Sequence, residues 1–386
     1  HVAQRLIQAV PDDYAIARFG GDEFIILIPR LEIKVAESHI KNLIIEIASE
    51  INKPFYIGDN KYSISTSAGY DIFSKCTISA ADIIKHADIA MYEAKHSGVT
   101  DGLIYDRSMS EKIDRKLMYT NELKYALVHD EFELHYQPQY DHQQHIIGAE
   151  ALLRWNNPRL GYESPAIFIP IAEQSDLIIG IDKWVLDRAC RDIKIMEETV
   201  ALGTLAKISI NISAKHLTKD YFIQSVISAV EQHGIDASHL SIEITEGIMV
   251  GDIEKSIRVL EELKQHHIEC SIDDFGTGYS SLTYLKKLPA SLIKIDRSFV
   301  QDLHKDSDNR SIANMIIDLG DNLHMDVIAE GVECQEEVDC LYNLGCRQYQ
   351  GFFFCKPIPF DQFMQLITPN TFALIAQSTN EFRPSL

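Results

Sequence analysis

The stretch that decides the fold covers residues 268–282 and reads Ile268-Glu-Cys-Ser-Ile-Asp273-Asp274-Phe-Gly276-Thr-Gly278-Tyr-Ser-Ser-Leu282. An apolar segment typical of a strand ends in two adjacent carboxylates, and two glycines follow before a segment that can begin a helix. Adjacent acids repel each other, and a divalent cation is the usual compensator because hard cations bind carboxylate oxygens. A solvated strand-to-helix turn would show the same local pattern, so the rest of the chain decides between the two interpretations.

Strand-like and helix-like segments alternate on both sides of this stretch, which is the pattern of α/β folds. The predicted strands cover residues 132–139, 146–154, 207–212, 240–246, 268–274, 292–296, 325–330 and 347–353. Predicted amphipathic helices cover residues 183–198, 221–232, 253–267 and 310–323. About 250 residues of such units suit a (β/α)8 barrel of the TIM type. The first two strands are joined too briefly for a crossover helix, so we expect one antiparallel strand.

Polar side chains recur where these predicted strands end, which is the face that carries the active site of such a barrel. The set is Glu150, Asn211, Glu243, Glu246, Asp273, Asp274, Lys294, Asp296 and Glu330. Each residue alone would be a helix cap or a surface charge more often than a ligand. Ionised groups are rarely buried unless they are paired or bound to metal, so the whole set predicts an oxygen-rich pocket for two metal ions.

Composition and charge limit the possible partners. The chain has 386 residues, of which 46% are hydrophobic and 24% charged, so it has material for two or three globular domains. The formal net charge is -21 and no basic face is evident, which excludes duplex nucleic acid as a partner. A small phosphate ligand held through metal ions is compatible with that charge.

Seven scattered cysteines indicate reduced thiols and a cytoplasmic location. Cys334, Cys340 and Cys346 recur every six residues, which is not the short paired spacing of a zinc site. No apolar run is long enough to span a bilayer. The first residue is His1, not Met, so we expect a piece of a longer protein that could be anchored to a membrane through an upstream region.

Near the start of the chain, two apolar segments flank Gly20-Gly21, which predicts a β-hairpin with Asp22 and Glu23 at its turn. By local chemistry alone, a turn rich in Gly and Asp is normally only a turn. The run Arg18-Phe-Gly20-Gly21-Asp22-Glu23-Phe24 nevertheless resembles the signature of the GGDEF family, the diguanylate cyclases, and residues 81–95 resemble the last long helix of that family. The resemblance implies a palm-like α/β sandwich fold and an enzyme activity that joins two GTP molecules.

Only about the second half of that domain is similar. The family's first metal-binding Asp and its guanine-reading Asn and Asp precede the region that matches, and residues 11–14 lack the Arg-x-x-Asp of the inhibitory product site. We therefore expect a partial cyclase site at Gly20, Gly21, Asp22 and Glu23 that makes no product from GTP. In an intact parent protein, Asp22 could hold a metal and Lys95 could contact a phosphate.

A second resemblance spans residues 117–367. The run Glu150-Ala-Leu-Leu-Arg154-Trp155 resembles the signature of the EAL family, phosphodiesterases of bacterial second-messenger signalling that open cyclic di-GMP to linear pGpG. Further similar motifs are Tyr136-Gln137-Pro138, Asn211-Ile-Ser213, Glu243-Ile-Thr-Glu246, residues 273–282, Lys294-Ile-Asp296, Glu330-Gly-Val-Glu333 and Gln350-Gly351. No position that the family uses for metal or catalysis is substituted.

The resemblance implies a role for each matching residue. Glu150, Asn211, Glu243 and Asp273 would hold a first Mg²⁺ or Mn²⁺, and Asp273, Asp274 and Glu330 a second. The two ions would clamp a phosphodiester and activate a shared water, with Lys294, Glu330, Asp273 and Glu150 as the catalytic group. Gln137, Arg154, Asp296 and Gln350 would contact the substrate, and Glu246 would anchor the loop 275–281. For Gln350, a plain hydrogen bond at a strand end is the alternative.

The predicted organisation is a partial GGDEF domain at residues 1–106, a helical connector at 107–120, an EAL domain at 121–375 and a tail at 376–386. The expected partners are cyclic di-GMP and a second copy of the chain, bound through the EAL domain. Two alternatives stay open. One is a receptor that binds cyclic di-GMP without cutting it, although such proteins usually lose a metal-binding acid. The other is a bifunctional cyclase and phosphodiesterase in the intact parent.

Overall fold

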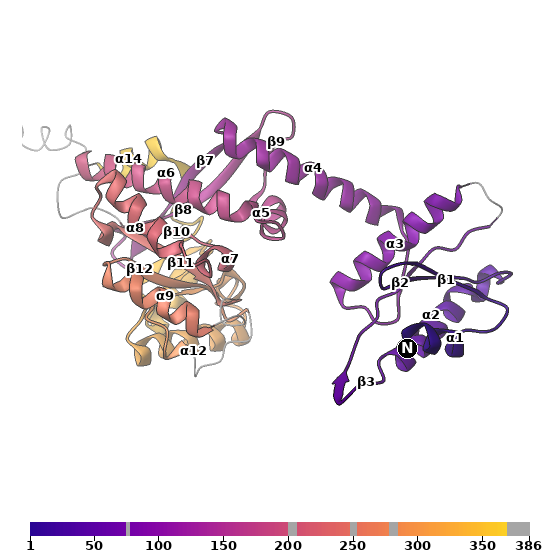
Figure 1. The fold of residues 1–386 in the computed structure, drawn as a ribbon. Coiled ribbons are helices and arrows are strands. Elements are labelled where there is room, and N and C mark those ends of the chain that lie inside the picture. The colour runs from indigo at the N-terminus through magenta and orange to yellow at the C-terminus, as the bar shows by residue number, and fades with distance from the viewer. Residues whose placement is uncertain (75–77, 200–206, 248–252, 278–284, 369–386) are drawn as a thin grey trace, which may run out of the picture. The chain divides into compact units, whose positions relative to one another are not determined.

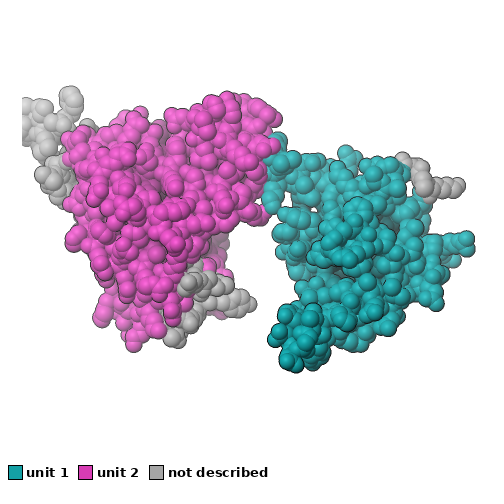
Figure 2. Space-filling model, in the orientation of Figure 1, with its two compact units in different colours: residues 1–118 teal, residues 119–386 magenta. Residues whose placement is uncertain are grey.

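The computed structural model describes residues 1–74, 78–199, 207–247, 253–277 and 285–368. The chain divides into two compact units, unit 1 at residues 1–118 and unit 2 at residues 119–386 (Figure 2). The division falls within helix α4 (Arg107–His129), which runs through both the predicted connector and the predicted start of the second domain. The predicted tail, 376–386, lies outside the described residues.

Eight strands of unit 2 close into a barrel. They are β7 (Phe132–Asp141), β8 (Ile146–Asn157), β10 (Lys207–Asn211), β11 (Leu240–Thr245), β12 (Glu269–Phe275), β13 (Leu292–Ile295), β14 (Asp326–Ala329) and β15 (Gln348–Tyr349). Neighbouring strands from β8 to β15 are parallel, while β7 is antiparallel to both β8 and β15 and closes the ring. The predicted barrel with one antiparallel strand is therefore confirmed. Short strands β9 (Gly161–Glu163) and β16 (Ile358–Pro359) pair with β8 and β7.

Helices cover the outside of the barrel (Figure 1). They are α5 (Pro165–Glu173), α6 (Leu177–Thr199), α7 (Ala214–Leu217), α8 (Phe222–His233), α9 (Ile253–Gln265), α11 (Arg297–Val300), α12 (Ser307–Leu323), α13 (Gln335–Leu344) and α14 (Phe360–Ile367), with a 3-10 turn at Ala237–His239. The four predicted helices are confirmed as α6, α8, α9 and α12, although α6 begins at Leu177 rather than Lys183. None of the described helices combines the length and apolar character needed to span a bilayer.

Strand alternation explains how polar side chains come to lie inside this barrel. In β10, Ile208 and Ile210 are fully buried, and α6 packs on this strand, while Ser209 and Asn211 have the opposite orientation. The same alternation places Glu243 of β11 beside Asn211, its register partner. Apolar residues therefore pack outward against helices, and the carboxyl ends of the strands present polar groups to the barrel interior.

Unit 1 contains helices α1 (Val2–Ala9), α2 (Ile33–Ile51) and α3 (Ala80–Ser97). Its described strands form three pairs: an antiparallel hairpin of β1 (Ala15–Gly20) and β2 (Glu23–Leu27), an antiparallel pair of β3 (Phe55–Ile57) and β4 (Asn60–Tyr62), and a parallel pair of β5 (Gly69–Tyr70) and β6 (Leu103–Ile104). The hairpin at Gly20-Gly21 is confirmed. Residues 63–68, between β4 and β5, form no strand.

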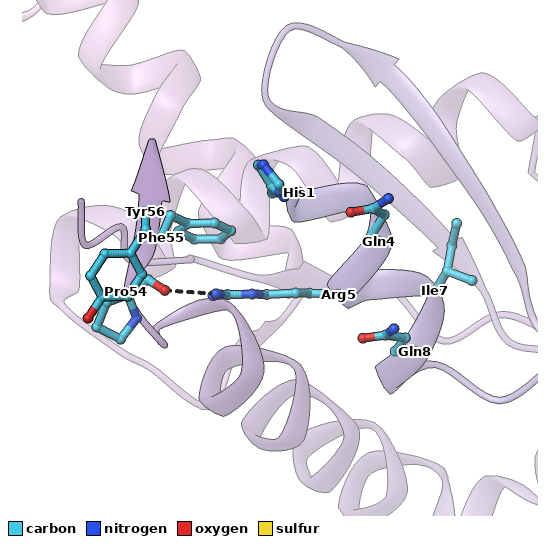
Figure 3. A pocket seen from close by; sticks show the side chains of 8 residues that line it. All are labelled: His1, Gln4, Arg5, Ile7, Gln8, Pro54, Phe55 and Tyr56. Carbon is cyan, nitrogen blue, oxygen red and sulfur yellow. Dashed lines mark hydrogen bonds between the residues drawn. The ribbon is translucent and has the colours of Figure 1, made fainter. Parts of the chain in front are cut away.

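A cavity of about 500 Å³ lies in unit 1 between α1 and residues 54–56 (Figure 3). Arg5 reaches across it, with its guanidinium 3.7 Å from the centroid of the Phe55 ring and donating to the carbonyl oxygens of Glu50 and Pro54. These contacts join α1 to the end of α2 and to β3. The cavity does not include Asp22 or Glu23.

Candidate active site

Lys294 lies at the centre of an acidic pocket in the barrel. Its side chain is fully buried, and its Nζ is 3.4 Å from Glu150, 2.5 Å from Glu243, 3.2 Å from Asp273 and 2.7 Å from Glu330. Burial alone would lower the pKa of Lys294, but these four carboxylates outweigh it and hold the pKa well above its ordinary value. The lysine is therefore a permanent cation that partly neutralises the pocket.

One lysine does not balance the acids around it. Burial and the neighbouring carboxylates raise the pKa of Glu243 well above its ordinary value, and burial raises that of Glu330 to about 8. Glu150 differs, because Lys294 and hydrogen bonds lower its pKa in spite of burial. Glu243 Oε1 is also buried without a hydrogen-bond partner among the described residues. The pocket thus has the electrostatic character of a site that takes further positive charge.

The arrangement of the oxygens fits a metal ion. One carboxylate oxygen each from Glu150, Glu243 and Asp273 lies within 4.8 Å of the others. Asn211 donates from Nδ2 to Glu150 Oε1 at 2.7 Å, so its amide adjoins the same group. The structure therefore brings together the four residues expected to hold a first metal, and carboxylate and amide oxygens are the ligands that Mg²⁺ and Mn²⁺ prefer.

A bulge at the end of β12 shapes the pair Asp273 and Asp274. The register with β13 shifts between Ile272 and Phe275, and Asp274 has φ 53°, a left-handed conformation that is uncommon for a residue other than glycine. Its backbone N–H donates to Asp273 Oδ1 at 3.0 Å. Burial, then Asp273 and Asp296, raise the pKa of Asp274 to about 6, so its carboxylate lies near the same acids.

Three glutamines line the pocket beside Glu150. Gln350 Nε2 donates to Glu150 Oε2 at 2.6 Å and to Gln137 Oε1 at 3.2 Å, and Gln139 Nε2 donates to Gln350 Oε1 at 2.9 Å. All three are buried. Sequence reasoning missed Gln139, although its position two residues after Gln137 on a strand puts both on one face. Gly148 is opposite it, where an added Cβ would lie 2.7 Å from Gln139 Oε1.

The remaining predicted residues lie near the carboxyl ends of β8, β11 and β13. Arg154 is half-buried near the end of β8, and its guanidinium donates to the carbonyl oxygen of Leu153 at 2.9 Å. Asp296 caps α11 and accepts from Ser298 N at 3.0 Å. Glu246 is buried and accepts from Gly276 N at 3.1 Å, which links the end of β11 to the segment after β12. Most of the predicted loop, 278–281, lies outside the described residues.

The predicted cyclase residues lie in unit 1. Gly20, Gly21, Asp22 and Glu23 are exposed at the turn between β1 and β2. Arg18 Nε donates to the carbonyl oxygen of Gly21 at 3.0 Å and fixes the turn. These contacts explain the shape of the hairpin and assign no chemistry to it.

Comparisons with known proteins match two different families to the two parts of the chain. The EAL domain family model matches residues 120–357, and the family described as diguanylate cyclase, GGDEF domain, matches residues 1–100. The bifunctional diguanylate cyclase/cyclic di-GMP phosphodiesterase MucR of Pseudomonas aeruginosa is 37% identical over 366 residues, which are 94% of this chain and 52% of MucR. The signaling protein YkoW of Bacillus subtilis is 38% identical over 366 residues, 95% of this chain and 45% of YkoW. The chain spans about half the length of these relatives.

Solved structures are similar as well. The PaMucR phosphodiesterase in complex with c-di-GMP has a TM-score of 0.61 and 40% sequence identity, covering 64% of this chain and 99% of that one. An EAL enzyme in a form bound to cAMP and cyclic di-GMP has a TM-score of 0.64 and 32% identity, covering 76% of this chain and 77% of that one.

Proposed function

This chain belongs to the EAL domain family, with a GGDEF-family region before it, and from that premise we propose that it hydrolyses cyclic di-GMP to linear pGpG in a metal-dependent reaction. The observation that carries the proposal is the cluster of four strand-end acids, Glu150, Glu243, Asp273 and Glu330, around buried Lys294. The names of similar proteins support the substrate, since MucR is described as a cyclic di-GMP phosphodiesterase.

The acids suit two divalent ions, Mg²⁺ or Mn²⁺. Glu150, Asn211, Glu243 and Asp273 would hold the first, and Asp273, Asp274 and Glu330 the second. Bound there, such ions supply Lewis-acid polarisation of a phosphodiester and a more acidic water. The negative charge that Lys294 leaves uncompensated is the physical reason to expect them.

The side chains themselves would bind and orient the reactants. Lys294, held protonated by its carboxylates, would donate hydrogen bonds to the attacking water or to a phosphate oxygen and offset developing negative charge. Glu150 and Glu330, which contact Lys294 Nζ, would keep it in place. Gln137 and Gln350 would contact the substrate from beside Glu150, and Arg154 and Asp296 from the pocket margin. Glu246 would hold the segment that begins at Phe275 through Gly276.

Product analysis tests this proposal. Purified protein with Mg²⁺ or Mn²⁺ is incubated with cyclic di-GMP, and the nucleotides are separated by chromatography. We expect pGpG from the wild type and none from Lys294→Met, whereas Lys264→Met, an exposed lysine on α9, should match the wild type. Binding of cyclic di-GMP by the wild type without any turnover would instead indicate a receptor.

We propose, from the family resemblance, that unit 2 forms a homodimer. Size-exclusion chromatography with light scattering over a range of concentrations tests this. A monomeric mass at every concentration, with and without cyclic di-GMP, would contradict it.

A further inference from the structure

A second group of metal-binding side chains lies outside the acidic pocket. His304, Cys334 and Glu337 each offer one ligand atom, and the three atoms lie within 4.8 Å of one another. His304 follows α11, Cys334 is the N-cap residue of α13, and Glu337 lies in the first turn of that helix. The group therefore joins the segment after β13 to the segment after β14.

Hydrogen bonds already explain part of this arrangement. Glu337 is buried, and its Oε1 accepts from Asp302 N at 2.9 Å, while its Oε2 accepts from Glu333 N at 2.7 Å and Cys334 N at 3.3 Å. These contacts hold the carboxylate rigidly between the two segments. They leave at least one lone pair free, because a carboxylate offers about four acceptor positions.

Capping does not explain His304. Its Nδ1 is buried and has no hydrogen-bond partner among the described residues. Leaving a buried nitrogen without a partner is energetically unfavourable, so such atoms usually have a partner that completes the site. Here the nearby groups with free lone pairs are a thiol and a carboxylate, and a cation is the partner that all three can share.

We propose that His304, Cys334 and Glu337 bind a Zn²⁺ ion. Zinc takes imidazole nitrogen, thiolate sulfur and carboxylate oxygen together, whereas Mg²⁺ and Ca²⁺ prefer oxygen alone. Zinc–ligand distances of about 2.0–2.3 Å put neighbouring ligand atoms about 3.5 Å apart, so on binding the ligand atoms would move closer together by up to about 1.3 Å. Water or exposed Glu336, which adjoins Cys334 on α13, would complete four-fold coordination.

The charged side chains around His304, Cys334 and Glu337 are compatible with a bound cation. The positive side chains nearby are engaged elsewhere: Lys305 pairs with Asp302 at 2.7 Å, Arg297 pairs with Glu333 at 2.6 Å, and Arg310 donates to the backbone carbonyl oxygen of His304 at 2.8 Å. Glu336 adds a negative charge next to Cys334. The six-residue spacing of the cysteines does not predict this site, since two of its three ligands are not cysteines. Cys346 is buried, and its Sγ contacts the carbonyl oxygen of Val327.

The site would connect two segments that carry pocket residues. The segment containing His304 follows Lys294 and Asp296, and the segment containing Cys334 follows Glu330. A shared ion would fasten them to each other without touching the acids of the pocket. Zinc binding at His304, Cys334 and Glu337 does not depend on which substrate the pocket takes.

Cobalt is a suitable probe, because only a sulfur ligand gives a thiolate-to-cobalt charge-transfer band and the acidic pocket offers oxygen and nitrogen alone. The full chain, kept reduced and supplied with excess Mg²⁺, is titrated with Co²⁺ and then with Zn²⁺. We expect one charge-transfer band per chain, bleached by one equivalent of Zn²⁺. Asp273→Asn should keep the band, which separates this site from the pocket.

Variants assign the ligands. Cys334→Ser should lose the band while it remains folded, since Ser is a good N-cap. Cys340→Ser, the matched control on the same helix, should keep it. Loss of a residue that only hydrogen-bonds to a metal ligand weakens metal binding about tenfold. His304→Ala removes a ligand itself and should therefore weaken Zn²⁺ binding by more than that. Absence of the band in the wild type, or an unchanged band in Cys334→Ser, would overturn the proposal, and unchanged affinity in His304→Ala would remove that ligand.

Discussion

Asp273 and Asp274 are adjacent in sequence but differ in their surroundings. Asp273 is 8% exposed and lies 3.2 Å from Lys294 Nζ, while Asp274 is only partly buried and occupies the left-handed position of the bulge. In the proposed site, Asp273 would contact both ions and Asp274 only the second. The two residues can therefore be separated by experiment.

We predict that Asp273→Asn abolishes turnover and that Asp274→Asn lowers it about a hundredfold, comparable to losing one group that stabilises transition-state charge. Metal stoichiometry and turnover are measured for each, with Asp361→Asn, an exposed residue of α14, as control. Both pocket variants should remain folded, since removing one of several like charges relieves repulsion. Wild-type turnover in Asp273→Asn would refute the proposed metal bridge.

Glu330 predicts a pH dependence of the metal-free protein. Its pKa is about 8 in the folded chain, above the ordinary value of 4.5, so the folded state binds more protons than the unfolded state between these values. Stability from this group is therefore present below about pH 4.5 and is lost as pH rises through about 8. In chelator, the melting temperature of the wild type should fall from pH 6 to pH 8, and the melting temperature of Glu330→Gln should fall less over the same range. An equal fall in both proteins would show that other groups cause it.

At the scale of elements, the turn after β15 depends on a glycine. A Cβ on Gly351 would lie 2.1 Å from the carbonyl oxygen and 2.3 Å from the nitrogen of Val332, so only glycine allows these two backbones to approach. Val332 N donates to the carbonyl oxygen of Gln350 at 3.1 Å, which fixes the residue whose side chain contacts Glu150. The close approach therefore places Gln350 in the pocket.

We predict that Gly351→Ala lowers the free energy of unfolding by about 1–3 kcal/mol, as overpacking does, and also reduces turnover by displacing Gln350. Urea unfolding and turnover measure the two effects. Gly247→Ala is the control, because a Cβ there has only an ordinary 3.8 Å contact with Thr245 Oγ1. Equal stability of both variants would show that the Val332 segment can move aside.

At the scale of the whole molecule, the chain divides into two compact units. The pocket belongs to unit 2, and ligands stabilise only the folded state that binds them, by about 2.7 kcal/mol at a hundredfold excess over Kd. We therefore predict two unfolding transitions in calorimetry. In the non-hydrolysing variant Lys294→Met, adding Ca²⁺ and cyclic di-GMP should raise the melting temperature of only one of them. A destabilising change in unit 1, such as Leu43→Ala at a buried position of α2, should lower the melting temperature of the other transition. A single transition that moves as a whole would contradict independent units.

Much of the barrel and its pocket could be predicted because their signals are local. Segments such as Ile208-Ser-Ile-Asn211 and Leu240-Ser-Ile-Glu243-Ile-Thr alternate apolar and polar residues, which gives both the strand and the orientation of each side chain. Polar groups at the ends of parallel strands must meet at one edge of the barrel. The sequence by itself therefore determined the fold class and the four acids and the lysine that meet in the pocket, although not Gln139.

Only the tertiary structure decided how those groups are arranged. The contact of Lys294 with four acids, the left-handed Asp274 and the link from Gln139 through Gln350 to Glu150 depend on strand register and on closure of the barrel. The proximity of His304 to Cys334 and Glu337 depends on how two separate segments pack. Spacing along a chain carries no information about such contacts, because the distance between residues far apart in sequence is set by the packing of the elements between them.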